Sequence, residues 1–121
     1  MGETNFIEGT VVSAESNSVR VDTALRQFTA TAHGRSLTVG QKVALSARPE
    51  AWKLGLDASL PNTITGAIRE RIYLGEMAQY RFGSGASVLK IYELNPRFVF
   101  ESTDREICAS IDPDDIVVLS E

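Results

Sequence analysis

Short segments in which apolar and polar residues alternate recur along the whole chain. Alternation with a period of two places apolar side chains on one face of an extended strand, so the pattern predicts β-strands rather than helices. Groups of small residues, such as Ser16–Ser18 and Gly83–Gly85, separate the segments and suit tight turns. The predicted strands are Phe6–Val12, Ser18–Asp22, Gln27–Ala32, Lys42–Ala47, Ile64–Ile68, Gln79–Phe82, Ser87–Tyr92, Arg97–Glu101 and Glu106–Ile111, with Phe98 and Phe100 on the core side of theirs.

Two segments that begin with proline are the only candidates for helical turns. Proline suits the first turn of a helix, and it stands at the start of Pro49–Leu56 and of Pro113–Leu119. The second segment is rich in β-branched residues, so we expect a short turn followed by a strand. Many short strands with little helix predict an all-β barrel or sandwich.

An internal repeat divides the chain. Asn5–Val11 reads N-F-I-E-G-T-V and Asn62–Ile68 reads N-T-I-T-G-A-I; later in each half, Lys42–Glu50 resembles Glu106–Asp114. The offset between the halves is 57 residues at the first echo (62 minus 5) and 64 at the second (113 minus 49). The second half therefore carries about seven extra residues, which we expect between residues 69 and 79.

Each half holds four or five predicted strands, the content of a small OB-like barrel. A unit of this size is only marginally stable alone, so the two halves should pack together. We expect one composite domain over residues 1–121, with lobe one at about residues 1–60 and lobe two at about 61–121. The junction Leu60–Asn62 is too short for an independent linker. Periodicity leaves open whether strands are exchanged between the lobes.

Composition narrows the function classes. With 121 residues, a net charge of −4 and one cysteine, Cys108, the chain is a poor electrostatic match for nucleic acid and has no internal disulfide, which fits a reducing cytoplasm. No apolar stretch approaches the roughly 20 residues that cross a bilayer, and no secretory signal is visible at the start. We therefore expect no nucleic-acid partner and no direct membrane insertion.

A series of motifs, taken in order, resembles one known family. The motifs are Gly2–Val11, Gly40–Glu50, Asn62–Gly66, Tyr73–Gly75, Tyr80 and Ile111–Leu119. Their order and spacing resemble the TOBE (transport-associated OB) domain at the C-terminus of ABC-importer ATPases of the spermidine/putrescine, iron and maltose types. The start Gly2–Phe6 is most similar to the polyamine branch.

The resemblance implies a regulatory and dimer-stabilising domain that performs no chemistry itself. Its parent would be an ATPase coupled to import, with ATP and magnesium held by a domain upstream of this chain. The implied partners are that ATPase domain, a second copy of the parent subunit and, through the parent, the membrane-spanning permease subunits. The implied location is the cytoplasm, at the inner membrane. The transported substrate cannot be read from this chain.

The residues themselves offer no catalytic or metal constellation, and we expect no cofactor in this chain. A phosphate-binding loop ending in Gly-Lys-Ser/Thr is missing from the sequence. His33 stands in a His-Gly turn and Cys108 in a predicted strand, so neither has the neighbour that nucleophilic catalysis needs. The acidic run Asp112–Asp115 lacks the alternating ligands of a calcium loop and is interpreted as a solvated turn.

Five residues are candidates for contacts with other domains. Arg48 and Glu50 flank Pro49 and suit an inter-domain ion pair, or else they are two exposed charges of a turn. Trp52 is interpreted as a barrel cap in preference to an interface anchor. Tyr73 and Leu74 lie in the expected insertion, and two interpretations stay open for them: a partner contact, or a strand-turn element with Tyr73 half buried.

Two other functions compete with this one. Free-standing molybdate-binding relatives also use paired TOBE lobes, but they carry Ser-Ala-Arg-Asn ahead of the glycine, whereas Glu3–Asn5 and Leu60–Asn62 keep only the asparagine. Single-stranded nucleic-acid binding by an OB fold needs a basic groove with stacking aromatic residues, and the acidic balance opposes it.

Overall fold

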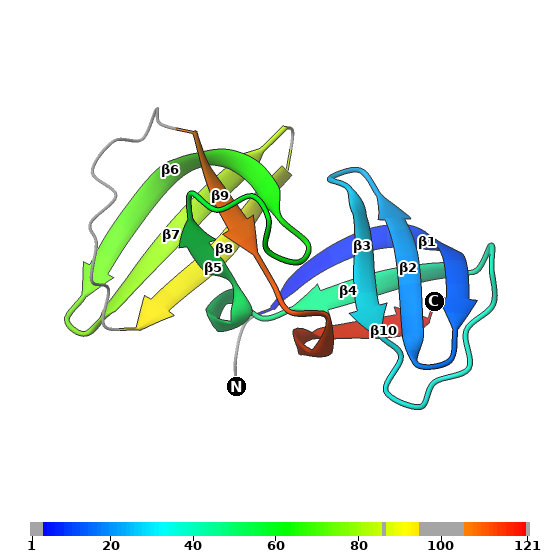
Figure 1. Ribbon diagram of the computed structural model, residues 1–121. Helices are drawn as coiled ribbons and strands as arrows, with labels where there is room; N and C mark the ends of the chain where they lie inside the picture. The colour runs from blue at the N-terminus through cyan, green and yellow to red at the C-terminus, as the bar shows by residue number, and fades with distance from the viewer. Residues whose placement is uncertain (1–3, 86, 95–105, 121) are drawn as a thin grey trace.

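The protein consists of two small β lobes side by side, as the ribbon of the computed structural model shows (Figure 1). The structure describes residues 4–85, 87–94 and 106–120. The first sheet has the order β10-β4-β1-β2-β3, made from β1 (Asn5–Glu15), β2 (Ser18–Thr23), β3 (Gln27–Thr31), β4 (Lys42–Ala47) and β10 (Ile116–Ser120). The second has the order β5-β9-β6-β7-β8, made from β5 (Lys53–Gly55), β6 (Ile64–Leu74), β7 (Met77–Ser84), β8 (Ser87–Leu94) and β9 (Glu106–Ser110).

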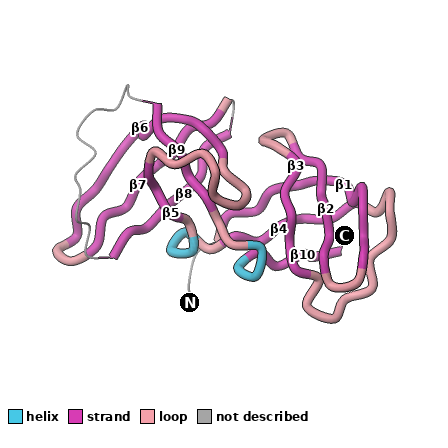
Figure 2. Tube along the Cα trace, viewed as in Figure 1, coloured by secondary structure: helices cyan, strands magenta, loops and turns pink. Residues whose placement is uncertain are grey.

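The predicted all-β class with two OB-like lobes is confirmed. Neighbouring strands in both sheets run antiparallel, and the edge strands β3 and β10 approach each other, so the first sheet curls into a barrel. Helix in the described residues is confined to two short 3-10 turns, η1 (Pro49–Ala51) and η2 (Pro113–Asp115), drawn in cyan in Figure 2. As expected, Pro113 opens a short turn that leads into a strand. The predicted strand Arg97–Glu101, with Phe98 and Phe100, lies outside the described residues.

Strands are exchanged between the two halves of the chain. After β4 the chain turns through η1 and adds β5 to the second sheet, where Lys53 is opposite Ser110. After β9 it turns through η2 and adds β10 to the first sheet, where Ile116 is opposite Ala47. The expected division at residues 1–60 and 61–121 therefore does not coincide with the sheets, because each proline turn carries the chain across to the other lobe (Figure 1).

The extra residues of the second half fall in two places. The offset between corresponding residues is 57 at Val11 and Ile68 (68 minus 11) and 61 at Val21 and Phe82 (82 minus 21). The β6–β7 hairpin is thus four residues longer than the β1–β2 hairpin. The remaining three extra residues lie after Lys90, so the expected insertion at residues 69–79 accounts for only part of the difference.

The repeated glycines stand where strands pass too closely for a side chain. A Cβ atom at Gly66 would lie 2.1 Å from the carbonyl oxygen of Gly83, and one at Gly9 would lie 2.6 Å from the carbonyl oxygen of Asp22. Both strands shift register just beyond the glycine, between Val11 and Ser13 in β1 and between Ile68 and Glu70 in β6. This local irregularity lets each long strand bend around its lobe.

Both lobes contribute to one continuous cluster of buried side chains. The largest fully buried members are Phe28 and Leu45 in the first sheet and Tyr80 and Phe82 in the second. Because inward residues alternate with outward ones along each strand, the outward faces remain available for contacts with other molecules.

Candidate functional site

Two asparagine side chains hold the lobes together at their two seams. The Asn5 side chain, at the start of β1, accepts a hydrogen bond from the Lys90 backbone N–H (2.9 Å) and donates to the Lys90 carbonyl (2.8 Å). It also donates to the Ala47 carbonyl at 3.2 Å. An amide side chain thus replaces a neighbouring strand along the edge of β8.

Asn62 repeats this arrangement in the opposite direction. Its side chain accepts from the Thr29 backbone N–H (2.8 Å) and donates to the carbonyls of Thr29 (2.9 Å) and Ile111 (3.1 Å). Both asparagines are buried, at 8% and 5% exposure. The repeated N-x-I-x-G motif is therefore a structural device: the asparagine clamps the other lobe and the glycine permits the strand crossing. Its buried inter-lobe role was not predicted, although the recurrence of asparagine was visible in the sequence.

The candidates Arg48 and Glu50 lie at η1, between the two lobes. Both side chains are exposed, and η1 packs against β8 of the second sheet. The ion pair recorded within the described part of the chain joins Arg81 to Glu70 and involves neither Arg48 nor Glu50.

Trp52 follows η1 and is 4% exposed. Its ring meets Phe28 of the first sheet edge to face, with centroids 6.3 Å apart and planes at 81°. The residue therefore packs in the core, at the point where the chain crosses from one lobe to the other. This geometry leaves little of the indole available to another domain.

Tyr73 and Leu74 end β6, at the outer end of the second lobe and away from η1 (Figure 1). Their exposures are 45% and 52%. The Arg71 guanidinium lies 5.9 Å from the centroid of the Tyr73 ring, a cation–π arrangement that orients the phenol. The structure does not bring this pair together with Arg48 and Glu50, so the five candidates form two separate surfaces and a buried core residue.

The outward face of the β6–β7–β8 sheet changes from polar to apolar toward the hairpin end. Strand register places its residues in three rows: Glu70–Arg81–Lys90, then Ile72–Gln79–Tyr92, then Leu74–Met77–Leu94. We call these three rows the hairpin face. The corresponding β1–β2 hairpin ends in Glu15–Ser18, all polar, so the longer hairpin adds an apolar end that its counterpart lacks.

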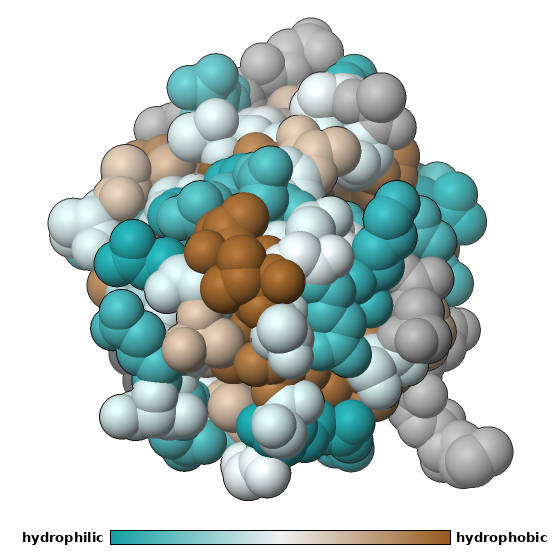
Figure 3. Space-filling model, turned by 90° about the vertical axis from the view of Figure 1, so that its right-hand side faces the viewer, coloured by the Kyte–Doolittle hydropathy of each residue, from teal (hydrophilic) through white to brown (hydrophobic). Residues whose placement is uncertain are grey.

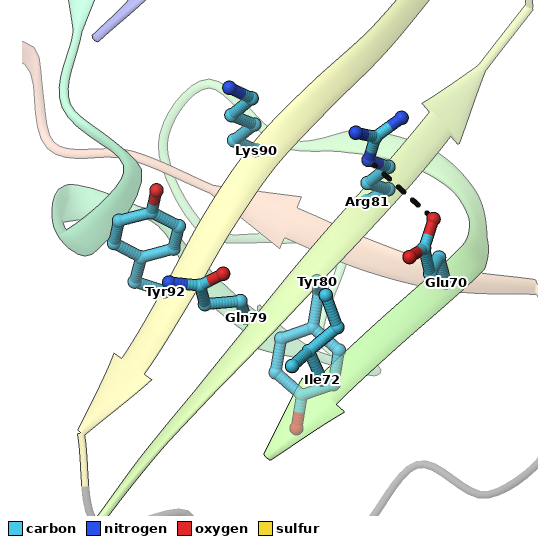
Figure 4. Close-up of a pocket in the computed structure, with 7 residues that line it drawn as sticks. All are labelled: Glu70, Ile72, Gln79, Tyr80, Arg81, Lys90 and Tyr92. Atoms are coloured by element: carbon cyan, nitrogen blue, oxygen red, sulfur yellow. Dashed lines mark ion pairs between the residues drawn. The ribbon is translucent and has the colours of Figure 1, made fainter. Parts of the chain in front are cut away.

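A shallow cavity of about 150 Å³ lies along the first two rows of the hairpin face, with Tyr80 also reaching its lining (Figure 4). Glu70 and Arg81 are paired across it at 3.6 Å, and both are more than half exposed. A surface pair of this kind stabilises the fold by well under about 1 kcal/mol. The cavity is small and open, which suits a protein contact better than enclosure of a ligand.

The inner side of the same strands holds a buried tyrosine and a glutamate. Tyr80 is 1% exposed, and its hydroxyl lies near enough to the Glu93 carboxyl for the charge of that carboxyl to act on it. Burial, followed by the neighbouring Glu93 charge, raises the pKa of Tyr80 to about 12. Burial also raises the pKa of the Glu93 carboxyl above its ordinary value. The pair links β7 to β8 beneath the hairpin face.

Chemistry-bearing groups are sparse in the parts of the chain that the structure describes. Within them, no three His, Cys, Asp or Glu side chains are grouped to hold a metal ion. The one sulfhydryl, Cys108, is partly exposed on β9. In the same residues, no helix has the length and apolar character needed to span a bilayer. On the face drawn in Figure 3, hydrophobic residues gather in a compact area surrounded by hydrophilic ones.

Comparison with protein families decides the assignment. The model of the family described as "TOBE domain" matches residues 45–119, which is more than half of the chain. The chain belongs to the TOBE domain family.

This TOBE domain is similar to one known protein in sequence and to another in structure. It is 34% identical over 82 residues to the spermidine/putrescine import ATP-binding protein PotA of Rubrobacter xylanophilus, a match that covers 66% of this chain and 21% of that protein. The chain thus matches about a fifth of the length of that relative. The fold is that of the cytoplasmic molybdate-binding protein ModG, whose molybdate-bound structure superimposes with a TM-score of 0.81 at 15% identity, over 97% of this chain and 96% of that one.

Proposed function

We propose that this TOBE domain is the regulatory and dimer-stabilising domain of an ABC-importer ATPase of the polyamine type. The observation that carries the proposal is the 34% identity to a spermidine/putrescine import ATP-binding protein, confined to a fifth of that protein's length. The domain itself is non-catalytic. In this proposal the ATP and magnesium sites belong to an ATPase domain elsewhere in the parent subunit.

In this proposal, two exposed surfaces contact different partners. The hairpin face, with Leu74 in its apolar row, is a contact surface for a partner such as the second copy of the parent. Tyr73 precedes Leu74 on the opposite side of the strand and is exposed at the same end of the lobe. Arg48 and Glu50 on η1 are charges available to the ATPase domain. Permease subunits are reached through the parent, and the complex works at the cytoplasmic side of the inner membrane. A stable protein–protein contact has an apolar centre, and the row Leu74–Met77–Leu94 supplies one on the hairpin face.

A chimera tests this proposal. This chain replaces the matching segment of the Rubrobacter relative, and the chimera is assayed for dimerisation by light scattering and for permease-stimulated ATP hydrolysis. We expect both properties to match those of the unaltered relative. Leu74→Glu should weaken dimerisation at least tenfold. The matched control is Leu56→Glu, because Leu56 is 61% exposed and lies outside the hairpin face. A folded chimera that hydrolyses ATP but neither dimerises nor responds to permease contradicts the proposal.

A second candidate function is free-standing binding of a small oxyanion. It is favoured by the fold shared with ModG over nearly the full length of both chains. Calorimetry of the chain with molybdate, and with sulfate for comparison, separates the two functions. Submillimolar molybdate binding supports the second candidate, and a flat titration removes it.

A further inference from the structure

The two seams between the lobes share the same asparagine hydrogen bonds but differ in the side chains around them. The asparagine bonds make Thr29 and Lys90 corresponding residues, so Arg26 and Gln27 of the Asn62 seam correspond to Ser87 and Val88 of the Asn5 seam. Each asparagine is followed by a further seam residue, Thr63 in one case and Phe6 in the other. Because the two seams correspond residue by residue, the Asn62 seam can be compared directly with the Asn5 seam.

The Asn62 seam is closed by polar contacts. The Arg26 guanidinium donates to the Thr63 carbonyl at 2.8 Å, across the seam, and to the Gln27 carbonyl at 3.0 Å. Gln27 is exposed and polar, as expected of a surface that faces water.

The Asn5 seam is instead an open apolar groove. Serine at position 87 is too short to span the seam as Arg26 does, and Phe6 and Val88 remain 64% and 57% exposed. A hollow of about 540 Å³ lies here, between the β2–β3 turn with Leu25 and the start of β8. Among the described residues that line it, Glu8 alone is charged.

A further exposed apolar residue lies on the first sheet, two strands away from Phe6. Register places Phe6, Ser46 and Val117 in one row across β1, β4 and β10, and Val117 is 39% exposed. The corresponding residues of the second lobe are Thr63, Ser110 and Lys53, which are polar throughout. Both the groove and this row thus differ from their counterparts in the same direction. Exposed apolar side chains gathered around a groove, as Phe6 and Val88 are, mark interaction sites.

We propose that the groove of Phe6, Leu25 and Val88, extended by Val117, docks the ATPase domain of the same subunit. This inference rests on the proposed function. Two observations favour this occupant: the importer ATPase relative extends far beyond the fifth of its length that this chain matches, and the groove lies directly beside Asn5 at the start of β1. The docking partner is an apolar cluster with a basic residue facing Glu8.

Thiol protection measures the docking directly. In a Cys108→Ser background, which removes the one cysteine of this chain, Val88→Cys and Phe6→Cys place a probe in the groove. Val39→Cys is the matched control because Val39 is 62% exposed in the loop before β4, outside the groove. Maleimide labelling rates at each position are compared between the isolated chain and the Rubrobacter chimera, with labelled peptides identified by mass spectrometry.

Docking predicts labelling at least tenfold slower at positions 6 and 88 in the chimera, with no change at position 39 and no dependence on protein concentration. Equal rates in chain and chimera overturn the inference. Protection that appears only at concentrations where the chimera dimerises also overturns it, since a second copy is then the occupant. The chimera's dimerisation and permease-stimulated ATP hydrolysis are read separately, so the proposed function stands or fails independently of the groove.

Discussion

Asn5 and Asn62, 57 positions apart (62 minus 5), make the same set of hydrogen bonds to opposite lobes. Each side chain bonds both backbone groups of one residue on the partner lobe and a carbonyl at the end of β4 or β9. An amide presents one acceptor and two donors in a plane, which is what a strand edge requires. The lobes are therefore joined by backbone-like bonding, not by side-chain packing alone.

Replacing these asparagines by alanine should destabilise the protein strongly. Asn5→Ala removes three hydrogen bonds and leaves buried backbone groups unpaired, so we expect a loss of about 2–3 kcal/mol in the free energy of unfolding. Asn62→Ala should cost about 1 kcal/mol more, because Asn62 has φ of 55°, a region that asparagine tolerates better than alanine. Urea denaturation measures both. Asn17→Ala at an exposed turn is the control, and a loss at Asn5 no larger than this control would contradict the prediction.

A methyl group at the repeated glycine of the second lobe should be poorly tolerated. Gly66→Ala places Cβ within 2.1 Å of a backbone oxygen on β7, which cannot move without breaking the sheet. We expect destabilisation of about 3 kcal/mol. Gly55→Ala is the matched control, since no atom lies within 4 Å of its added Cβ and its stability should change by less than about 0.5 kcal/mol. Equal thermal unfolding midpoints for the two variants would show that the close crossing is not required.

Much of the fold could be predicted because alternation and repetition are local properties of the sequence. The strands from Phe6 to Ala47 and from Ile64 to Tyr92 follow the period of two, and the two proline turns mark the ends of β4 and β9. The exchange of β5 and β10 could not be predicted, because partner choice depends on long-range geometry that periodicity does not encode. Periodicity therefore places the boundary between the lobes at the midpoint of the sequence, whereas the sheets divide the chain differently.

The candidate sites were predicted less completely. Tyr73 and Leu74 were found because an insertion relative to a repeat indicates a projecting element. Trp52 lies in the core because the chain crosses between lobes there, a consequence of the strand exchange. The groove at Phe6 and Val88 was missed, since these residues come together only when β1 and β8 meet at the seam.

The buried phenol of Tyr80 should ionise well above the ordinary pKa of a tyrosine. Its pKa is raised to about 12, so the folded state favours the neutral phenol and loses stability as the pH rises from about 10 through 12. Absorbance at 295 nm follows the ionisation of phenols, and a phase near pH 12 should be present in the wild type. Tyr80→Phe should remove this late phase. Its persistence in Tyr80→Phe would contradict the assignment.

The raised pKa of Glu93 predicts a stability that falls with rising pH. A carboxyl whose folded-state pKa lies above its ordinary value holds its proton more tightly when folded, so this contribution is greatest below about pH 4.5 and is lost as the pH rises through the folded-state pKa. Glu93→Gln cannot ionise and therefore escapes this loss.

Urea unfolding of the two proteins between pH 4 and pH 8 measures the difference. Comparing them at each pH cancels the carboxylates that they share. The stability of Glu93→Gln relative to the wild type should increase with pH and then level off above the folded-state pKa. Any constant offset reports the altered contact with Tyr80. A difference that stays flat or decreases with pH would mean that burial does not oppose ionisation of Glu93.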